Sequence, residues 1–219
     1  MNETGKVGSR EPCPLCGSDS ERRLQGGDER TYLLCANCKL IFVPEGEHLS
    51  SADERARYET HQNSVENKGY VEFLNRMLKP VSNYLTPGMR GLDYGCGPGP
   101  TLSTLARQRG FRCDDYDPLF MNVDLLTEYD FILSTECFEH FRRPSHEIER
   151  ILEILAPGGI LGVMTEAWVD TVDFSQWYYT RDPTHICFYH ADSIRHICDS
   201  FSMQMLWSDS RRVFILQRN

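Results

Sequence analysis

The sequence has no long apolar segment and no excess of positive charge. No run of about 18 apolar residues occurs among its 219 residues, so a membrane span is not expected. The opening stretch, MNETGKVGSREPC, has no apolar core of the kind found in secretion signals, which favours a cytoplasmic protein. Acidic residues outnumber basic ones by 32 to 23, and the net charge of −9 argues against non-specific binding of nucleic acid.

The composition is that of an ordinary globular protein. Hydrophobic residues make up 40% of the chain and charged residues 25%, which excludes collagen-like and wholly disordered classes. The length suits one full-size domain plus a small accessory module. Five of the nine cysteines are scattered and are expected to be small buried hydrophobes. They are Cys96, Cys113, Cys137, Cys187 and Cys198.

The other four cysteines form two Cys-x-x-Cys pairs, namely Cys13, Cys16, Cys35 and Cys38. Eighteen residues separate the pairs, a spacing typical of a four-cysteine zinc site. Gly17 permits the tight turn that such a cysteine knuckle needs. Disulfides are the alternative, which the missing secretion signal disfavours. Four thiolates leave no open coordination position, so we expect a structural zinc that stabilises a zinc ribbon over residues 1–44.

A polar linker over residues 45–55 separates this module from the rest of the chain. Apolar residues recurring at steps of three and four predict a helix over residues 69–85, which Pro80 should kink or split. Later patterns predict helices over 145–155 and 193–201, the second capped by Asp192.

A glycine-rich loop follows a short apolar strand that ends at Asp93. The loop contains Gly95, Gly97 and Gly99, and a predicted helix begins at Thr101. A strand, a glycine loop and a helix in this order form a ligand site at the carboxyl end of a parallel strand. The loop matches neither the dinucleotide fingerprint nor the phosphate loop, which requires Gly-Lys-Ser/Thr. An acidic residue just before the loop suits a cationic ligand group better than a phosphate.

The segment Leu92–Gly99 resembles the first motif of the class I S-adenosylmethionine-dependent methyltransferases. Three more segments match this family in order: 111–118, 130–141 and 155–159. The resemblance covers about residues 56–219. It implies an α/β fold with a Rossmann-like, mostly parallel sheet that ends in an antiparallel C-terminal hairpin.

The resemblance also implies S-adenosylmethionine as the methyl donor and S-adenosylhomocysteine as the product. Asp117 corresponds to the acidic residue that holds the ribose hydroxyls. Tyr58, His61 and Asn63 match a stretch that precedes the domain in a subgroup with the same zinc module, and they could close over the donor. The residues implied to bind the donor are Asp93, Gly95, Cys96, Gly97, Gly99, Asp117, Pro118, Glu136, His140, Tyr58 and Asn63.

The sequence departs from the family after the second strand. Only twelve residues separate Asp117 from Asp130, whereas a parallel crossover alone needs about a dozen. We therefore expect the third strand to be missing. The segment 121–125 is the candidate to replace its contact with adenine.

The chemistry is expected in an aromatic-rich insert over residues 166–190. A sulfonium methyl is already activated, so a base is needed only when the acceptor must lose a proton. His185 is the first candidate base, with His140 and His61 as alternatives. Each histidine could instead be structural, and the aromatic residues could line the substrate or form core.

Together these observations predict a methyltransferase (EC 2.1.1.-) that acts on a small or flat acceptor by O-, N- or C-methylation. One alternative is an RNA-base methyltransferase whose zinc ribbon holds RNA. The six basic and seven acidic residues of segment 1–45 count against it. Another alternative is a non-catalytic docking protein built on a retired methyltransferase fold.

Overall fold

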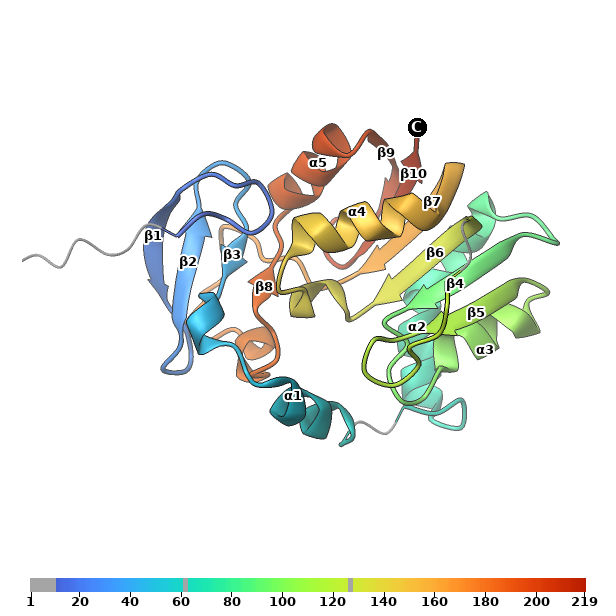
Figure 1. Cartoon of the computed structure of the whole chain (residues 1–219), viewed down its shortest axis with the longest axis horizontal. Helices are drawn as coiled ribbons and strands as arrows, with labels where there is room; N and C mark the ends of the chain where they lie inside the picture. The colour runs from blue at the N-terminus through green and yellow to red at the C-terminus, as the bar shows by residue number, and fades with distance from the viewer. Residues whose placement is uncertain (1–10, 61–62, 126–127) are drawn as a thin grey trace, which may run out of the picture.

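The structure, a computed structural model, describes residues 11–60, 63–125 and 128–219. Its strands form two sheets, which lie side by side in Figure 1. The smaller sheet has the order β1-β2-β3-β8 and the larger one the order β5-β4-β6-β7-β10-β9. None of the helices in the described ranges has the length and apolarity needed to cross a membrane.

The smaller, antiparallel sheet contains β1 (Ser20–Gln25), β2 (Thr31–Cys35), β3 (Ile41–Phe42) and β8 (Cys187–Phe188). Strands β2 and β3 fall where the sequence suggests them, but β8 comes from the distant insert. Ile41 pairs with Phe188, and the Val43 amide donates to the Ile186 carbonyl at 2.9 Å. The N-terminal module therefore shares its sheet with the aromatic-rich insert.

The larger sheet contains β4 (Arg90–Tyr94), β5 (Arg112–Tyr116), β6 (Tyr129–Thr135), β7 (Leu155–Met164), β9 (Met203–Ser208) and β10 (Val213–Arg218). Strands β5, β4, β6 and β7 are parallel, and β10 is antiparallel to both β7 and β9. Within the described part of the chain, no strand pairs with the outer edge of β5. The mostly parallel sheet, its final hairpin and the missing third strand are as predicted.

The helices are α1 (Ser51–Tyr58), α2 (Lys68–Val81), α3 (Thr101–Gln108), α4 (Pro144–Ile154) and α5 (Ala191–Ser200). Short 3-10 helices are η1 (Glu45–Glu47), η2 (Ser82–Tyr84), η3 (Phe138–His140) and η4 (Tyr178–Arg181). Helices α4 and α5 cover one face of the larger sheet, and α2 and α3 cover the other (Figure 1). Helix α2 ends one residue after Pro80 and continues as η2, so the proline splits the predicted helix.

The predicted cap of α5 is wrong. The His190 side chain, rather than that of Asp192, accepts from a helix amide, namely Asp192 N at 3.1 Å. The Ser193 hydroxyl in turn accepts from the His190 amide. A histidine before a helix is an uncommon cap, and that is why the sequence pattern favoured the aspartate.

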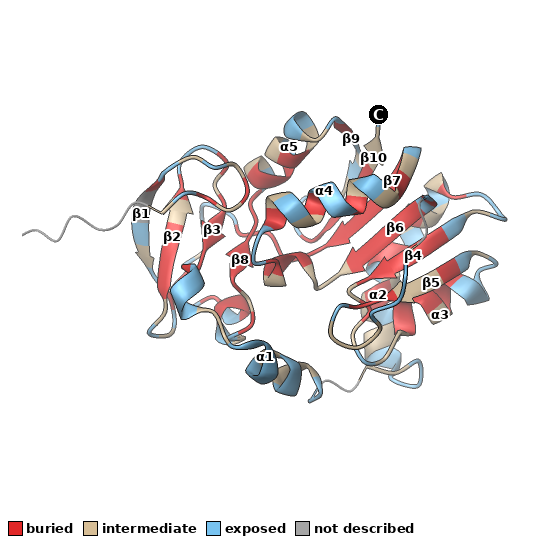
Figure 2. Ribbon diagram, viewed as in Figure 1, coloured by how far each residue is buried: buried red, intermediate tan, exposed pale blue. Residues whose placement is uncertain are grey.

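The buried residues form one continuous layer from the small sheet to the face under α4 and α5 (Figure 2). Leu40 and Phe42 of the N-terminal module belong to the same core cluster as Ile148 and Ile197. Two hydroxyls fix this junction. That of Ser145 donates to the Pro14 carbonyl at 3.0 Å, and that of Ser193 donates to the Cys38 carbonyl at 2.8 Å. The segment predicted to be a linker contains η1 and the start of α1.

Most of the aromatic residues of the insert are core. Trp168, Phe174 and Trp177 are buried in a cluster with Tyr32 and Phe188 at the junction of the insert and the small sheet. They bind the two parts together and do not line a cavity.

Candidate functional site

A cavity of about 1060 Å³ opens at the carboxyl ends of the parallel strands. Ligands of open α/β sheets bind at this edge. The cavity is lined by the glycine loop, the end of β5, the turn after β6, α1 and part of the insert. Its volume lies at the upper end of the range for small-molecule sites, which leaves room for two ligands of moderate size.

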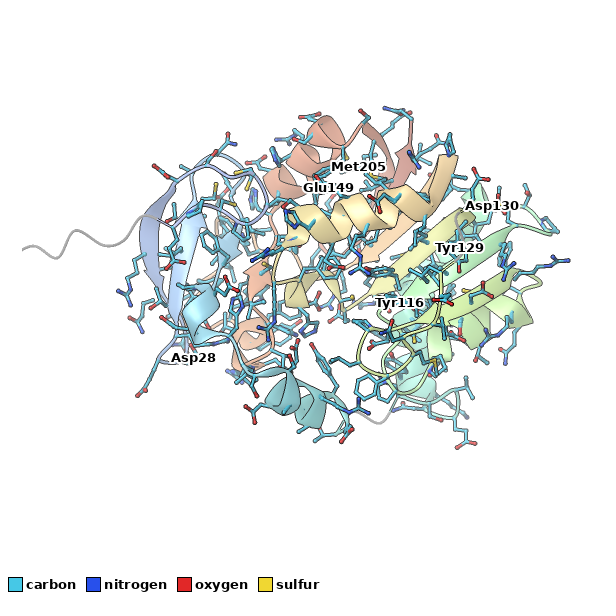
Figure 3. All side chains as sticks on the ribbon, in the orientation of Figure 1. Asp28, Tyr116, Tyr129, Asp130, Glu149 and Met205 are labelled. Carbon is cyan, nitrogen blue, oxygen red and sulfur yellow. The ribbon has the colours of Figure 1, made fainter. Side chains whose placement is uncertain are left out.

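The glycine loop follows β4 and is fixed to the neighbouring strand. Gly95 and Gly97 have φ values of +82° and +64°, a region that glycine enters without strain. A Cβ on Gly95 would lie 2.3 Å from the Cys137 sulfur. The amides of Gly95 and Cys96 both donate to the Tyr116 carbonyl, at 2.8 and 3.1 Å. Tyr116, labelled in Figure 3, thus ties the loop to the end of β5.

Asp117, the residue after β5, connects the loop to the following turn. One carboxylate oxygen accepts from the Gly97 amide at 3.0 Å. The other accepts from the amides of Leu119 and Phe120, at 2.8 and 3.1 Å. An ionised carboxylate has about four acceptor positions, of which these amides use three. Asp117 lines the cavity, so the remaining position can accept from a ligand hydroxyl.

Asp93, the penultimate residue of β4, lies beneath the loop and is 2% exposed. Its carboxylate accepts from the Ser103 amide at 3.2 Å and so holds the first turn of α3 in place. Burial, helped by the nearby Asp115 carboxylate, raises the pKa of Asp93 to about 7. Asp93 thus stabilises the start of α3, which follows the glycine loop.

Glu136 lies in the turn after β6 with φ +48°, an uncommon conformation for a residue other than glycine. Its carboxylate accepts from Arg212 at 2.9 Å, and Arg212 also pairs with Glu166. Burial and the neighbouring Glu139 carboxylate raise the pKa of Glu136 to about 8. A residue at the cavity wall that combines an uncommon backbone conformation with a shifted pKa is typical of a functional position.

His140 and His185 lie together at the other end of the cavity, with ring centroids 4.9 Å apart. The Nδ1 of His140 contacts the Thr184 carbonyl at 2.9 Å, and the Nδ1 of His185 contacts the Tyr179 carbonyl at 2.8 Å. Because a carbonyl only accepts, each Nδ1 carries a hydrogen. Burial lowers the pKa of His185 to about 4, which keeps this ring neutral and leaves a lone pair on its Nε2.

Two arginines hold the loop that carries His185. Arg57 of α1 donates to the Asp182 carboxylate at 2.7 Å. Burial opposes ionisation of Asp182, but hydrogen bonds from Thr184, helped by Arg57, outweigh it and lower its pKa to about 2. Arg30, from the turn between β1 and β2, donates to the carbonyls of Thr180 and His185 at 2.6 and 2.8 Å.

Helix α1 and the segment after it cover the cavity. The Tyr58 ring meets the His140 ring edge-on, with centroids 5.2 Å apart. The Asn63 backbone lies against the loop, because a Cβ on Gly99 would come within 2.6 Å of the Asn63 carbonyl oxygen. Every residue implied to bind the donor lines the cavity except Gly99. His61 lies outside the described residues.

The four N-terminal cysteines converge on one point away from the cavity. Their sulfurs lie within 4.8 Å of one another, with the Cys13–Cys38 pair at 3.6 Å and the Cys16–Cys35 pair at 3.4 Å. All four are free thiols. Sulfurs around a tetrahedral zinc at 2.3 Å are about 3.8 Å apart, so the cluster fits that ion.

The turns after the two cysteine pairs have the same backbone form. Gly17 and Lys39 have φ values of +72° and +55°, and each amide donates to the carbonyl of the first cysteine of its pair. The glycine was expected from the sequence, and the lysine repeats its conformation in the second turn.

A family model described as a methyltransferase domain matches residues 60–205 of this chain. The chain belongs to the methyltransferase-domain family. The match spans the glycine loop, Asp117 and both cavity histidines, and so includes most of the residues that line the cavity, whereas Arg57 and Tyr58 of α1 precede it.

Solved structures of methyltransferases share the fold. A Burkholderia thailandensis 1,6-didemethyltoxoflavin N1-methyltransferase, bound to its substrate and S-adenosylhomocysteine, superposes with a TM-score of 0.54. The two chains are 11% identical, over 84% of this chain and 98% of that one. CalO1, a methyltransferase of calicheamicin biosynthesis in its S-adenosylhomocysteine-bound form, gives a TM-score of 0.51 at 10% identity, over 77% and 59% of the two chains.

A curated relative shares more sequence over a shorter stretch. The non-reducing polyketide synthase nvfA of Aspergillus novofumigatus is 32% identical over 99 residues. The match takes in 42% of the methyltransferase chain but 4% of the synthase. The chain therefore corresponds to a small part of that much longer protein.

Three residues of the site escaped the sequence analysis: Arg30, Glu139 and Arg212. Glu139 was read only as part of the turn after β6, although its 0% exposure makes it the most buried acid at the site. Arg30 and Arg212 reach the site from distant parts of the chain. Their contacts can be identified only from the structure, since no local sequence pattern indicates partners so distant along the chain.

Proposed function

We propose that this methyltransferase uses S-adenosylmethionine to methylate a small or flat acceptor held at the histidine end of the cavity. The observation that carries the proposal is the connection between the glycine loop and Asp117, whose carboxylate keeps acceptor capacity toward the cavity. That S-adenosylhomocysteine occupies solved structures with this fold supports the same donor. When bound, the donor supplies a methyl group already activated on a sulfonium.

Different residues of this chain are proposed to contact different parts of the donor. Asp117 accepts a hydrogen bond from a ribose hydroxyl with its remaining acceptor position. The backbone of the loop and the first turn of α3 face the amino-acid end of the donor, where a helix N-terminus favours a carboxylate. Glu136 is placed to pair with the amino group at that end. The segment 121–125, which follows β5 in place of a third strand, is the candidate for the adenine contact.

The acceptor lies between the donor and the two histidines. Both histidines line the cavity and contact carbonyls through Nδ1, so in either neutral ring Nε2 is the atom that would accept a proton from the acceptor. Tyr179 lies against His185 and narrows the space, which suits a flat molecule. The match with a polyketide synthase makes phenols and enols the first acceptors to test.

The cysteine cluster is proposed to hold a structural zinc. Its four thiolates would complete a tetrahedral shell and leave no position for substrate. Because the ribbon packs on α4, α5 and the insert, zinc at this point would stabilise the histidine end of the cavity from outside.

The test is calorimetric titration of the purified protein with S-adenosylmethionine and S-adenosylhomocysteine. We expect Asp117→Ala to weaken both by at least about 10-fold, since hydrogen bonds to a charged group contribute about 1.5–3 kcal/mol each. The matched control is Asp114→Ala, on the same strand, where the carboxylate pairs with Arg90.

Two outcomes would contradict the proposal. If the folded, zinc-loaded protein binds neither compound, the docking-protein alternative replaces it. If the protein instead binds bulk RNA in a salt-dependent manner and methylates it, the RNA alternative replaces the small acceptor.

A further inference from the structure

Glu139 is a buried carboxyl group with no cationic side chain paired to it among the described residues. The residue is 0% exposed, and its carboxylate accepts hydrogen bonds from the Thr165 hydroxyl at 2.8 Å and the Tyr179 hydroxyl at 2.5 Å. Among the residues that the structure describes, no lysine or arginine forms an ion pair with it. A buried carboxylate without a cationic partner is costly, so a missing partner is implied.

Two further acidic residues lie close to Glu139. Glu136 and Glu166 share the buried Arg212 between them, and the Tyr179 hydroxyl that donates to Glu139 also lies 3.4 Å from a Glu136 oxygen. Arg211, the other partner of Glu166, has a side chain that is 73% exposed. Arg212 is therefore engaged by these two neighbours, and a divalent cation would give Glu139 a positive partner of its own.

The atoms next to Glu139 are those that a transition metal binds. One oxygen of Glu139 and one nitrogen each of His140 and His185 lie within 4.8 Å of one another. Two histidines and one carboxylate form a common ligand set for divalent transition metals, with the remaining positions open. Ligand atoms about 2.1 Å from an ion require each atom to move by about 1 Å or less from this arrangement.

The supporting contacts are also those of a metal site. Metal-ligating histidines donate their other ring nitrogen to a carbonyl or carboxylate, which orients the ring. Both Nδ1 atoms here contact backbone carbonyls, which directs both Nε2 lone pairs away from those carbonyls. The hydroxyls of Thr165 and Tyr179 orient the carboxylate in the same way.

We propose that Glu139, His140 and His185 bind a divalent transition-metal ion, separate from the cysteine cluster, whose open positions face the cavity. Its role rests on the proposed function. The ion would bind an oxygen of the acceptor and lower the pKa of that oxygen's proton. Acceptors with an enol, phenol or hydroxy-acid oxygen fit this site. One lone pair cannot hold both a metal and a proton, so on this proposal neither His140 nor His185 is the base, and both orient the acceptor through the ion.

The experiment is a Co²⁺ titration of the full chain with its cysteine cluster already loaded with zinc. Zinc binds such sites more tightly than cobalt, so the cluster does not exchange. We expect one further Co²⁺ per chain, measured by calorimetry and by visible absorption without thiolate bands. His140→Ala and His185→Ala should each weaken binding by at least about 10- to 100-fold. His196→Ala, on α5 and away from the cavity, is the matched control and should bind like the wild type.

The outcomes separate the two proposals, because donor binding is measured on the same samples. A wild-type protein that binds S-adenosylmethionine but no Co²⁺ beyond the zinc overturns the metal site alone. Equal weakening by the His196 variant also overturns it. The variant Glu139→Gln, close in shape but without the charge, guards against misfolding. It should retain donor binding and lose Co²⁺ affinity. A wild-type protein that binds Co²⁺ but no donor contradicts the proposed function and leaves the metal site intact.

Discussion

Asp93 has a buried side chain, and its hydrogen bond is made to the backbone of the protein. It lies beneath the loop, accepts from the Ser103 amide and is shielded from water. Its raised pKa means that the folded state holds a proton which the unfolded chain has already released between about pH 4 and pH 7. The contribution of this proton to stability is complete below about pH 4. It is lost as the pH rises through 7.

We therefore expect Asp93→Asn to gain stability relative to the wild type as the pH rises. The asparagine oxygen can still accept from Ser103 but has no proton to lose. Between pH 5 and pH 8 the difference in unfolding free energy should shift by about 2–3 kcal/mol in favour of the variant, at about 1.4 kcal/mol per pKa unit. Urea unfolding at both pH values measures it.

The control for this prediction is Asp114→Asn, which removes an exposed carboxylate of β5 that pairs with Arg90. Its stability difference should change by less than about 1 kcal/mol over the same range. A pH-independent difference for the Asp93 variant would show that the buried carboxylate is ionised throughout.

At the residue scale, the sequence identified what local spacing determines. Asp117 was found because it ends a strand at a fixed distance after the glycine loop. His185 was found because it lies in the aromatic-rich insert, in an Asp-Pro-Thr-His segment that resembles one in a methyltransferase subgroup. Glu139 was missed because its significance depends on total burial and on two hydroxyls from residues 165 and 179. Neither condition can be read from neighbouring residues.

Arg30 joins two segments that are far apart in the sequence. They are the turn between β1 and β2 and the loop after η4. Arg30 is held in place by Asp28, labelled in Figure 3, at 2.7 Å. Its guanidinium then reaches four carbonyls, those of residues 180, 182, 183 and 185. An arginine used in this way positions His185 from outside the cavity.

We expect Arg30→Ala to loosen this loop without changing the donor site. Hydrogen–deuterium exchange should become at least about 10-fold faster for amides near His185, because bonds from a charged donor contribute about 1.5–3 kcal/mol each. Affinity for S-adenosylmethionine should stay within about twofold. Arg23→Ala is the matched control, since Arg23 lies on β1 and contacts Thr31 instead. Unchanged exchange in the Arg30 variant would exclude the positioning role.

At the element scale, most helices and strands were predictable because each has its own apolar period. Strand β8 was not, because a two-residue strand has no period and takes its partner from the N-terminal module. The aromatic residues beside it looked equally suited to substrate or core. The contact of Trp177 with Tyr32 and Phe188 decides for core, and that contact depends on the same pairing.

The whole molecule has one core that runs from the cysteine cluster to the sheet. Loss of the metal should therefore lower the stability of the whole chain and not only that of the ribbon. We expect Cys35→Ser to lower the zinc content by one ion per chain and the melting temperature by at least about 5–10 °C, at about 2–4 °C per kcal/mol for a chain of this size.

Cys198→Ser is the control for this zinc prediction, because Cys198 is a half-buried thiol of α5 outside the cluster. Elemental analysis and calorimetry measure both effects. If the Cys35 variant melted like the control, the cysteine cluster would contribute nothing to the stability of the chain.

At the scale of the whole molecule, the sequence predicted the layered sheet, the hairpin and the absent third strand. It did so because strand order follows from connection lengths and family order. How the ribbon sits could not be predicted, since it rests on single contacts such as Ser193 with Cys38 and Ser145 with Pro14. These join residues more than a hundred positions apart.

The pairing of β3 with β8 has a consequence for how the chain is made. The cysteine module is synthesised well before β8 and α5, which complete its sheet and pack against it. Metal can gather the cysteines early, but the sheet remains open along β3 until residues 187–188 have emerged from the ribosome. Contacts this distant in sequence form slowly. We expect β8 to pair with β3 in the same late step in which the loop that carries His185 takes its final position. A chain truncated before residue 187 would therefore leave the edge of β3 unpaired and this loop unfixed.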